Sequence, residues 1–89
     1  AKNYREVVEI AVQTQMGVIG RKLALSLARK VEGLEIDEEG KVERMENDGK
    51  TTIKDLIEQY EKASGPVASA IISRNLDVDS RLEVPEKLR

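Results

Sequence analysis

The sequence lacks the side chains on which much protein chemistry depends. It contains no cysteine and no histidine among its 89 residues. This excludes disulfide bonds, thiolate or imidazole metal sites, and the Ser-His-Asp and Cys-His forms of catalysis within this chain. Acid–base chemistry would depend on carboxylates, lysine or tyrosine, and no residue spacing predicts a catalytic site. We therefore expect a protein that is not an enzyme and that holds no cofactor.

Aromatic residues are almost absent. Phenylalanine and tryptophan are missing and there are two tyrosines, so the core has to be built from Val, Ile, Leu and Ala. These side chains bury less area than an aromatic ring. A chain of this length also buries only about 60–65% of its unfolded surface. We expect residues 1–89 to form a single domain that gains stability by packing against a second copy, as a homodimer.

Neither sign of charge dominates, and long apolar runs are absent. Fifteen Lys and Arg residues against 17 Asp and Glu give a net charge of −2, which does not provide the basic surface of a nucleic-acid binder. No apolar run approaches the roughly 18 residues of a membrane span, and no leader pattern opens the sequence. The expectation is a cytoplasmic protein without nucleic acid or membrane partners. Its charged fraction of 36% is similar to that of heat-adapted and small archaeal proteins.

Hydrophobic periodicity predicts four helical segments. Asn3, followed by Glu6, has the spacing of a capping box at the start of the first helix. Thr51 or Thr52 is the expected cap of the third helix, and Ser64-Gly65-Pro66 ends it. The first, second and fourth helices are predicted at 4–15, 18–31 and 66–74. The predicted buried stripe of the third helix is Ile53, Leu56, Ile57 and Tyr60. That of the fourth helix is Val67, Ala70 and Ile71.

Alternating apolar and charged residues predict a short antiparallel hairpin over 33–37 and 41–45, with Gly40 in its turn. Residues 76–79 alternate as a further strand would, and the tail 85–89 is expected to be frayed or extended. The predicted fold class is α+β: helix pairs with a short antiparallel β-hairpin or small sheet.

Small residues recur every fourth position in two of the predicted helices. Residues 17–31 form the longest apolar-rich run and are expected to supply most of the core. The small residues are Gly20, Ala24 and Ala28 in the first set, and Gly65, Ser69 and Ser73 in the second. Such a ridge lets another helix approach closely. The offset of 45 residues also predicts a duplication, with residues 1–45 and 46–84 as pseudo-repeats; chance similarity between two helices is the alternative.

An acidic segment, residues 35–46, has the spacing of an EF-hand calcium loop. Oxygen-bearing side chains fall at positions 1, 3, 5 and 12, and a glycine falls at position 6. The candidate calcium ligands are Glu35, Asp37, Glu39 and Glu46. Against this interpretation, glutamate replaces the shorter aspartate at two positions, and residues 47–49 suit a turn better than a helix. A hairpin with a solvated acidic face explains the same residues.

Two arginines, Arg29 and Arg74, occupy equivalent positions in the proposed repeats and are candidate contacts for an anion. The alternative is that they lie in solvent and form surface ion pairs with nearby glutamates.

Three functional hypotheses remain open from the sequence. The first is a non-enzymatic protein-interaction or regulatory module, homodimeric, that binds itself and an unidentified protein. The second is a sensor of a small ligand or divalent ion that uses residues 35–46. The third, with least support, is a carboxylate-based enzyme, which would require a cleft holding two or more perturbed acidic groups.

Overall fold

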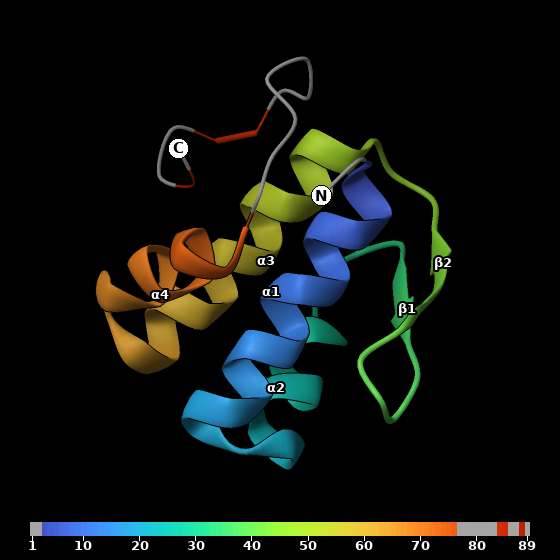
Figure 1. The fold of residues 1–89 in the computed structure, drawn as a ribbon. Coiled ribbons are helices and arrows are strands. Elements are labelled where there is room, and N and C mark those ends of the chain that lie inside the picture. The colour runs from blue at the N-terminus through green and yellow to red at the C-terminus, as the bar shows by residue number, and fades with distance from the viewer. Residues whose placement is uncertain (1–2, 77–83, 86–87, 89) are drawn as a thin grey trace.

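The computed structural model describes residues 3–76, 84, 85 and 88. In this part of the chain, four helices and a two-stranded antiparallel sheet form a small α+β fold (Figure 1), which confirms the predicted class. The helices are α1 (Tyr4–Ile19), α2 (Arg21–Ala28), α3 (Gly49–Ser64) and α4 (Val67–Asn75); the strands are β1 (Leu34–Ile36) and β2 (Val42–Met45). None of these helices is long and apolar enough to cross a membrane.

The first helix begins as predicted but extends further. Asn3 accepts a hydrogen bond from the Glu6 N–H at 2.9 Å and caps α1. Gly17 lies inside the helix, and the break falls at Gly20 alone, whose φ of +91° is one that L side chains rarely adopt. The second helix begins after this break, at Arg21, and ends at Ala28, so it is shorter at both ends than the predicted 18–31.

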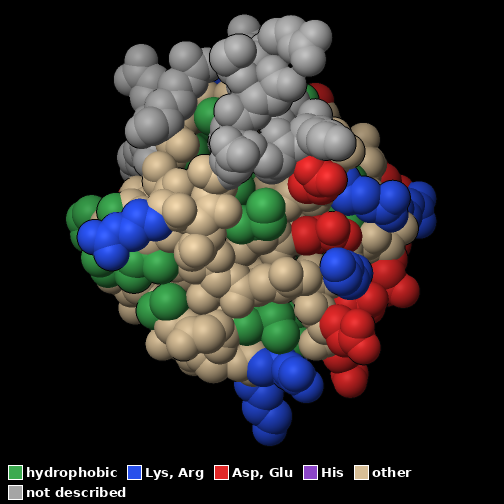
Figure 2. Space-filling model, in the orientation of Figure 1, with side chains coloured by type: hydrophobic (Ala, Val, Ile, Leu, Met, Phe, Trp, Pro, Cys, Tyr) green, Lys and Arg blue, Asp and Glu red, His purple; other side chains and the backbone are tan. Residues whose placement is uncertain are grey.

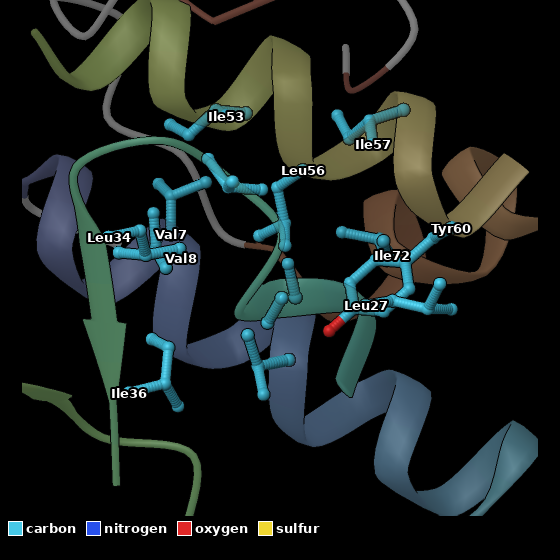
Figure 3. Close-up of a cluster of buried hydrophobic side chains, with 14 of the residues drawn as sticks. Val7, Val8, Leu27, Leu34, Ile36, Ile53, Leu56, Ile57, Tyr60 and Ile72 are labelled. Atoms are coloured by element: carbon cyan, nitrogen blue, oxygen red, sulfur yellow. The ribbon is translucent and has the colours of Figure 1, made fainter. Parts of the chain in front are cut away.

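The packing centre is α1, not residues 17–31. This helix packs against α2, α3, α4 and β2, and it buries Val7, Val8, Ala11 and Val12. Figure 3 shows Val7 and Val8 of α1 facing Ile53 and Leu56 of α3. The 17–31 run contributes five residues to the core but not most of it, and its Val18 and Leu23 are 46% and 45% exposed. The chain turns at Gly20, so both side chains lie at a corner of the molecule.

The third helix confirms its predicted stripe but not its predicted cap. Ile53, Leu56, Ile57 and Tyr60 are all buried. The cap is Asp48, whose carboxylate accepts the Thr51 N–H at 3.0 Å, so α3 begins at Gly49. Aspartate is a strong N-cap acceptor, and its position three residues before Thr51 suits this bond. The helix then ends before Gly65, which has a φ of +74°.

The fourth helix lies over 67–75, as expected, but its predicted buried stripe is wrong. The buried residues are Ala68, Ser69 and Ile72, whereas Val67 and Ala70 are exposed and Ile71 is half-buried. At about 100° per residue, the centres of the two stripes lie roughly 150° apart, on nearly opposite sides of α4. Because both contain alanine and a β-branched residue, periodicity alone does not distinguish them.

The C-terminal residues that the structure describes lie against the core. Val84 and Leu88 are buried, and the Ser73 hydroxyl donates to the Leu88 carbonyl at 3.2 Å. This differs from the frayed tail expected over 85–89, because leucine and valine gain free energy by leaving water. Residues 77–79 of the predicted last strand lie outside the described residues, and the 45-residue duplication stays a prediction.

Candidate functional site

The small-residue ridges are used for packing within the chain. Ala24 and Ala28 are fully buried, and the Tyr60 hydroxyl of α3 donates to the Ala24 carbonyl at 3.0 Å. Ser69 is also buried and donates to the Pro66 carbonyl. Ser73 is half-buried. Gly20 and Gly65, by contrast, lie at the two helix breaks, where a Cβ would meet no atom within 4 Å. Their role is in the backbone turn, not in close approach.

The four candidate calcium ligands of the hairpin do not form a metal site in the described structure. The Asp37 carboxylate accepts the N–H groups of Glu39 and Lys41, each at 2.9 Å, and so closes the turn. Glu46 forms an ion pair with Arg44, which also lies 3.9 Å from Glu35. Glu39 is exposed. Across the described ranges, no group of three or more acidic side chains is placed to hold a metal ion.

The two candidate anion contacts lie on different elements and do not form one site. Arg29 follows α2, donates to the Ile36 carbonyl at 3.4 Å, and lines an open hollow of about 350 Å³. Arg74 lies in the last turn of α4 and does not line this hollow. The charged lining of the hollow is balanced in sign: Arg29, Lys30, Arg44, Glu32, Glu35 and Glu46.

The outer edge of β2 is covered by two charged residues of α1 that sequence reasoning missed. The Val42 N–H donates to the Glu9 carboxylate at 2.9 Å, and the Arg5 guanidinium donates to the Val42 carbonyl at 2.8 Å. In sequence, Arg5 and Glu9 have the i, i+4 spacing of an intrahelical ion pair. That spacing was a signal that they share a face, but it did not identify the strand that they contact.

An apolar stripe on α4 faces solvent. Val67 is 52% exposed, Ala70 is exposed, Ile71 is half-exposed, and Arg74 continues the same face. Figure 2 shows hydrophobic side chains gathered around a basic side chain over α4, at the left of the view. Helical spacing at i, i+3, i+4 and i+7 places these residues in one line along α4. Val67 is the most exposed of the large hydrophobic side chains in the described residues.

Among the residues that the structure describes, two ionisable side chains have shifted pKa values, and both shifts have structural causes. Hydrogen bonds from the Thr51 backbone and then its side chain hold the pKa of Asp48 below its usual value of 3.8. Burial raises the pKa of the Tyr60 hydroxyl well above its usual value of 10.0. A neutral, buried tyrosine that donates to a carbonyl stabilises packing and is poorly placed to exchange a proton.

Comparisons with protein-family models, with curated proteins and with solved structures find no match to this chain. Its function is therefore argued from its own surface.

Proposed function

We propose that this chain is a non-enzymatic protein-interaction module that forms a homodimer through the exposed face of α4. The observation that carries the proposal is the stripe of Val67, Ala70 and Ile71. A helix that packs on its own fold normally turns such a stripe inward. Here the buried side of α4 is made of the smaller set Ala68, Ser69 and Ile72, and the more apolar line is left to solvent.

The stripe has the shape expected of a self-complementary contact. In a twofold dimer, the same face of α4 would pack antiparallel against itself. Ala70 lies near the middle of the helix, where its small side chain would let the two axes approach. Val67 and Ile71 flank this point and would supply most of the buried apolar area.

The charge at the end of the stripe also fits a second copy. In the antiparallel arrangement, Arg74 of one copy lies beside the start of α4 in the other, close to the C-terminal end of α3. The last carbonyl groups of a helix carry a partial negative charge that attracts cations. The contact would therefore bury no unpaired charge at its centre, and each Arg74 would lie at its rim.

The absence of catalytic function belongs to the same proposal. Two observations support it. The shifted pKa values of Asp48 and Tyr60 arise from a helix cap and from burial. In the hairpin, Asp37 accepts a backbone N–H of its own turn and Glu46 pairs with Arg44. An active site more often combines perturbed ionisable groups with a cleft.

Light scattering after size exclusion, across micromolar to sub-millimolar concentrations, tests the dimer. The wild-type chain is expected to approach twice the monomer mass of 9.9 kDa as concentration rises. Ala70→Glu is expected to keep the chain monomeric, since two carboxylates would meet in the dry centre of the contact. Ser26→Glu, on the exposed side of α2, is the matched control and should dimerise normally.

Circular dichroism of both variants checks that each remains folded, as their exposed positions predict. A wild-type chain that stays monomeric throughout the concentration range would exclude the proposal. So would a dimer that Ala70→Glu leaves intact.

A further inference from the structure

The two outer edges of the hairpin differ in how their backbone groups are satisfied. At β2, both outward groups of Val42 are bonded to α1: the N–H to Glu9 and the carbonyl to Arg5. Side chains that bond the backbone in this way prevent another strand from pairing there. This edge is closed.

The edge of β1 is only half closed. Ile36 is the register partner of Val42, and Leu34 is the partner of Met45. Both are positions from which the N–H and carbonyl point away from the neighbouring strand. The Ile36 carbonyl accepts from Arg29 at 3.4 Å, and the Leu34 N–H donates to the Val31 carbonyl at 3.2 Å. No hydrogen bond to the Leu34 carbonyl or the Ile36 N–H is found among residues 3–76.

These two open groups match the requirement of a parallel strand. In a parallel pair, one residue donates its N–H to the carbonyl of residue j−1 and accepts at its own carbonyl from the N–H of residue j+1. With Glu35 as residue j, the receiving groups are the Leu34 carbonyl and the Ile36 N–H. An antiparallel strand in which Glu35 forms a non-hydrogen-bonded pair would use the same two groups: the Leu34 carbonyl would accept and the Ile36 N–H would donate.

Space for an added segment lies alongside β1. The open hollow of about 350 Å³ includes Leu34 and Glu35 in its lining, and a second one of about 290 Å³ includes Leu34, Glu35 and Ile36. Arg29 contributes to both. Residues on or beside β2 also line these hollows, Arg44 and Glu46 in the larger and Glu43 in the smaller, so both extend from β1 over the solvent face of the hairpin.

Charge indicates which side chain such a peptide should carry. Residues 32–46 contain seven acidic residues against two basic ones, a formal charge of −5. Glu35 is exposed, and its carboxylate lies 3.9 Å from Arg44, which makes its closer contact with Glu46. A residue paired with Glu35 across a new strand would have its side chain on the same solvent face. A lysine or arginine there would be favourable.

A second copy of this chain fits the β1 edge poorly. Twofold pairing of β1 with itself through the Leu34 carbonyl and the Ile36 N–H would be antiparallel and centred on Glu35. It would place Glu35 opposite its equivalent, and like charges in that position are destabilising. The expected occupant is therefore a segment of a different protein.

We propose that β1 receives an extended strand from a partner protein, with a lysine or arginine of that strand opposite Glu35. The contact combines two backbone hydrogen bonds, to the Leu34 carbonyl and from the Ile36 N–H, with one cross-strand ion pair. It is a mode of peptide recognition by strand addition. It lies on a different surface from the α4 face and does not depend on dimer formation.

Amide chemical shifts of the full chain, recorded during titration with a capped peptide Thr-Val-Lys-Val-Thr, test this contact. The largest shifts are expected at Glu35 and Ile36. The peptide Thr-Val-Glu-Val-Thr should bind roughly fivefold more weakly, since an opposite-charge pair becomes a like-charge pair. Glu35→Lys should reverse this preference, whereas Glu38→Lys, in the exposed turn, should retain it.

Methylation of single peptide nitrogens tests whether a strand is formed. In a parallel strand the N–H of the central lysine donates to the Leu34 carbonyl, and in an antiparallel strand the N–H of the following valine does. N-methylation of the donating residue should abolish the shifts, whereas binding should persist when the other residue is methylated.

Three results would overturn the proposal: no shift at Ile36 with millimolar peptide, equal effects of the two methylated peptides, or shifts confined to the acidic turn. The mass measured by light scattering reports on α4 alone. Failure of one proposal is therefore distinguishable from failure of the other.

Discussion

Gly49 and Gly17 both lie in helices but have opposite surroundings. A Cβ on Gly49 would overlap the Cβ and ring atoms of Tyr4, whereas a Cβ on Gly17 would meet nothing within 4 Å. Glycine in a helix interior is less favourable than alanine by roughly 0.5–1 kcal/mol. Gly17→Ala is therefore expected to raise the free energy of unfolding by about this amount. Gly49→Ala is expected to lower it by about 1–3 kcal/mol, because Tyr4 has to move.

Urea denaturation of the two glycine variants measures both changes against the wild-type chain. The opposite signs are the critical result, since helix propensity alone predicts a gain for each. A stabilised Gly49→Ala variant would show that Tyr4 does not pack against the start of α3.

Single residues also show where sequence patterns mislead. Gln15 is fully buried in α1, and neither polar atom of its side-chain amide has a hydrogen-bond partner in the described structure. Its position follows the apolar face of the helix, four residues after Ala11. This position on the helix buries Gln15, although glutamine is a residue type that is mostly exposed. Such a residue is a departure from the rule that buried polar groups are bonded.

At the scale of the element, the start of α3 depends on the charge of Asp48. Its carboxylate accepts the Thr51 N–H, and this bond lowers the pKa in the folded state. A depressed folded pKa gives stability that is present above the unfolded value, near 3.8, and is lost as pH falls through the folded pKa. We expect the thermal midpoint of the wild-type chain to exceed that of Asp48→Asn above about pH 4, and this difference to disappear in stronger acid.

Thermal unfolding followed by circular dichroism over this pH range gives the comparison. Asp48→Ala serves as the reference for a lost cap and should be the least stable variant above pH 4, since asparagine keeps an acceptor and alanine does not. A difference between Asp48 and Asp48→Asn that persists unchanged into strong acid would contradict a role for the carboxylate charge.

The elements differ in how far local patterns could predict them. The Asn3 cap, the buried stripe of α3 and the break at Gly65 are set by residues within a few positions of one another, and the sequence was sufficient for them. The exposed face of α4 was not, because apolar residues lie on both sides of this short helix. Periodicity determines the width of an apolar face, but neighbouring elements determine which way it turns.

Contacts between distant segments decided the candidate surfaces. Arg5 and Glu9 reach Val42 across 37 and 33 positions of sequence, and this contact is what makes the two edges of the hairpin unequal. The EF-hand spacing of residues 35–46 was present, but spacing alone does not show that a carboxylate is already bonded in its own turn, as that of Asp37 is. The sequence therefore identified the hairpin and its acids without identifying the edge that we propose as a binding site.

At the scale of the whole molecule, Leu88 tests whether the C-terminal residues belong to the core. Leu88 is 3% exposed, and Leu23 is 45% exposed, although both are leucines. Removing a buried leucine side chain to Cβ costs about 2–5 kcal/mol. We expect Leu88→Ala to lower the free energy of unfolding by about 2 kcal/mol, the low end of that range, because the position is near a terminus. Leu23→Ala should change it by less than about 0.5 kcal/mol.

Urea denaturation of the two leucine variants makes the same chemical change in both places, so intrinsic differences between leucine and alanine largely cancel. Equal, small effects would mean that the core is complete without Leu88. A large effect at Leu88 alone would show that the core needs this C-terminal leucine for its stability. Tyr60 is the only fully buried aromatic side chain in the described core, so the rest of the core is aliphatic. The same result would also place the outer face of α4, and not its side toward Leu88, as the surface left for a second copy.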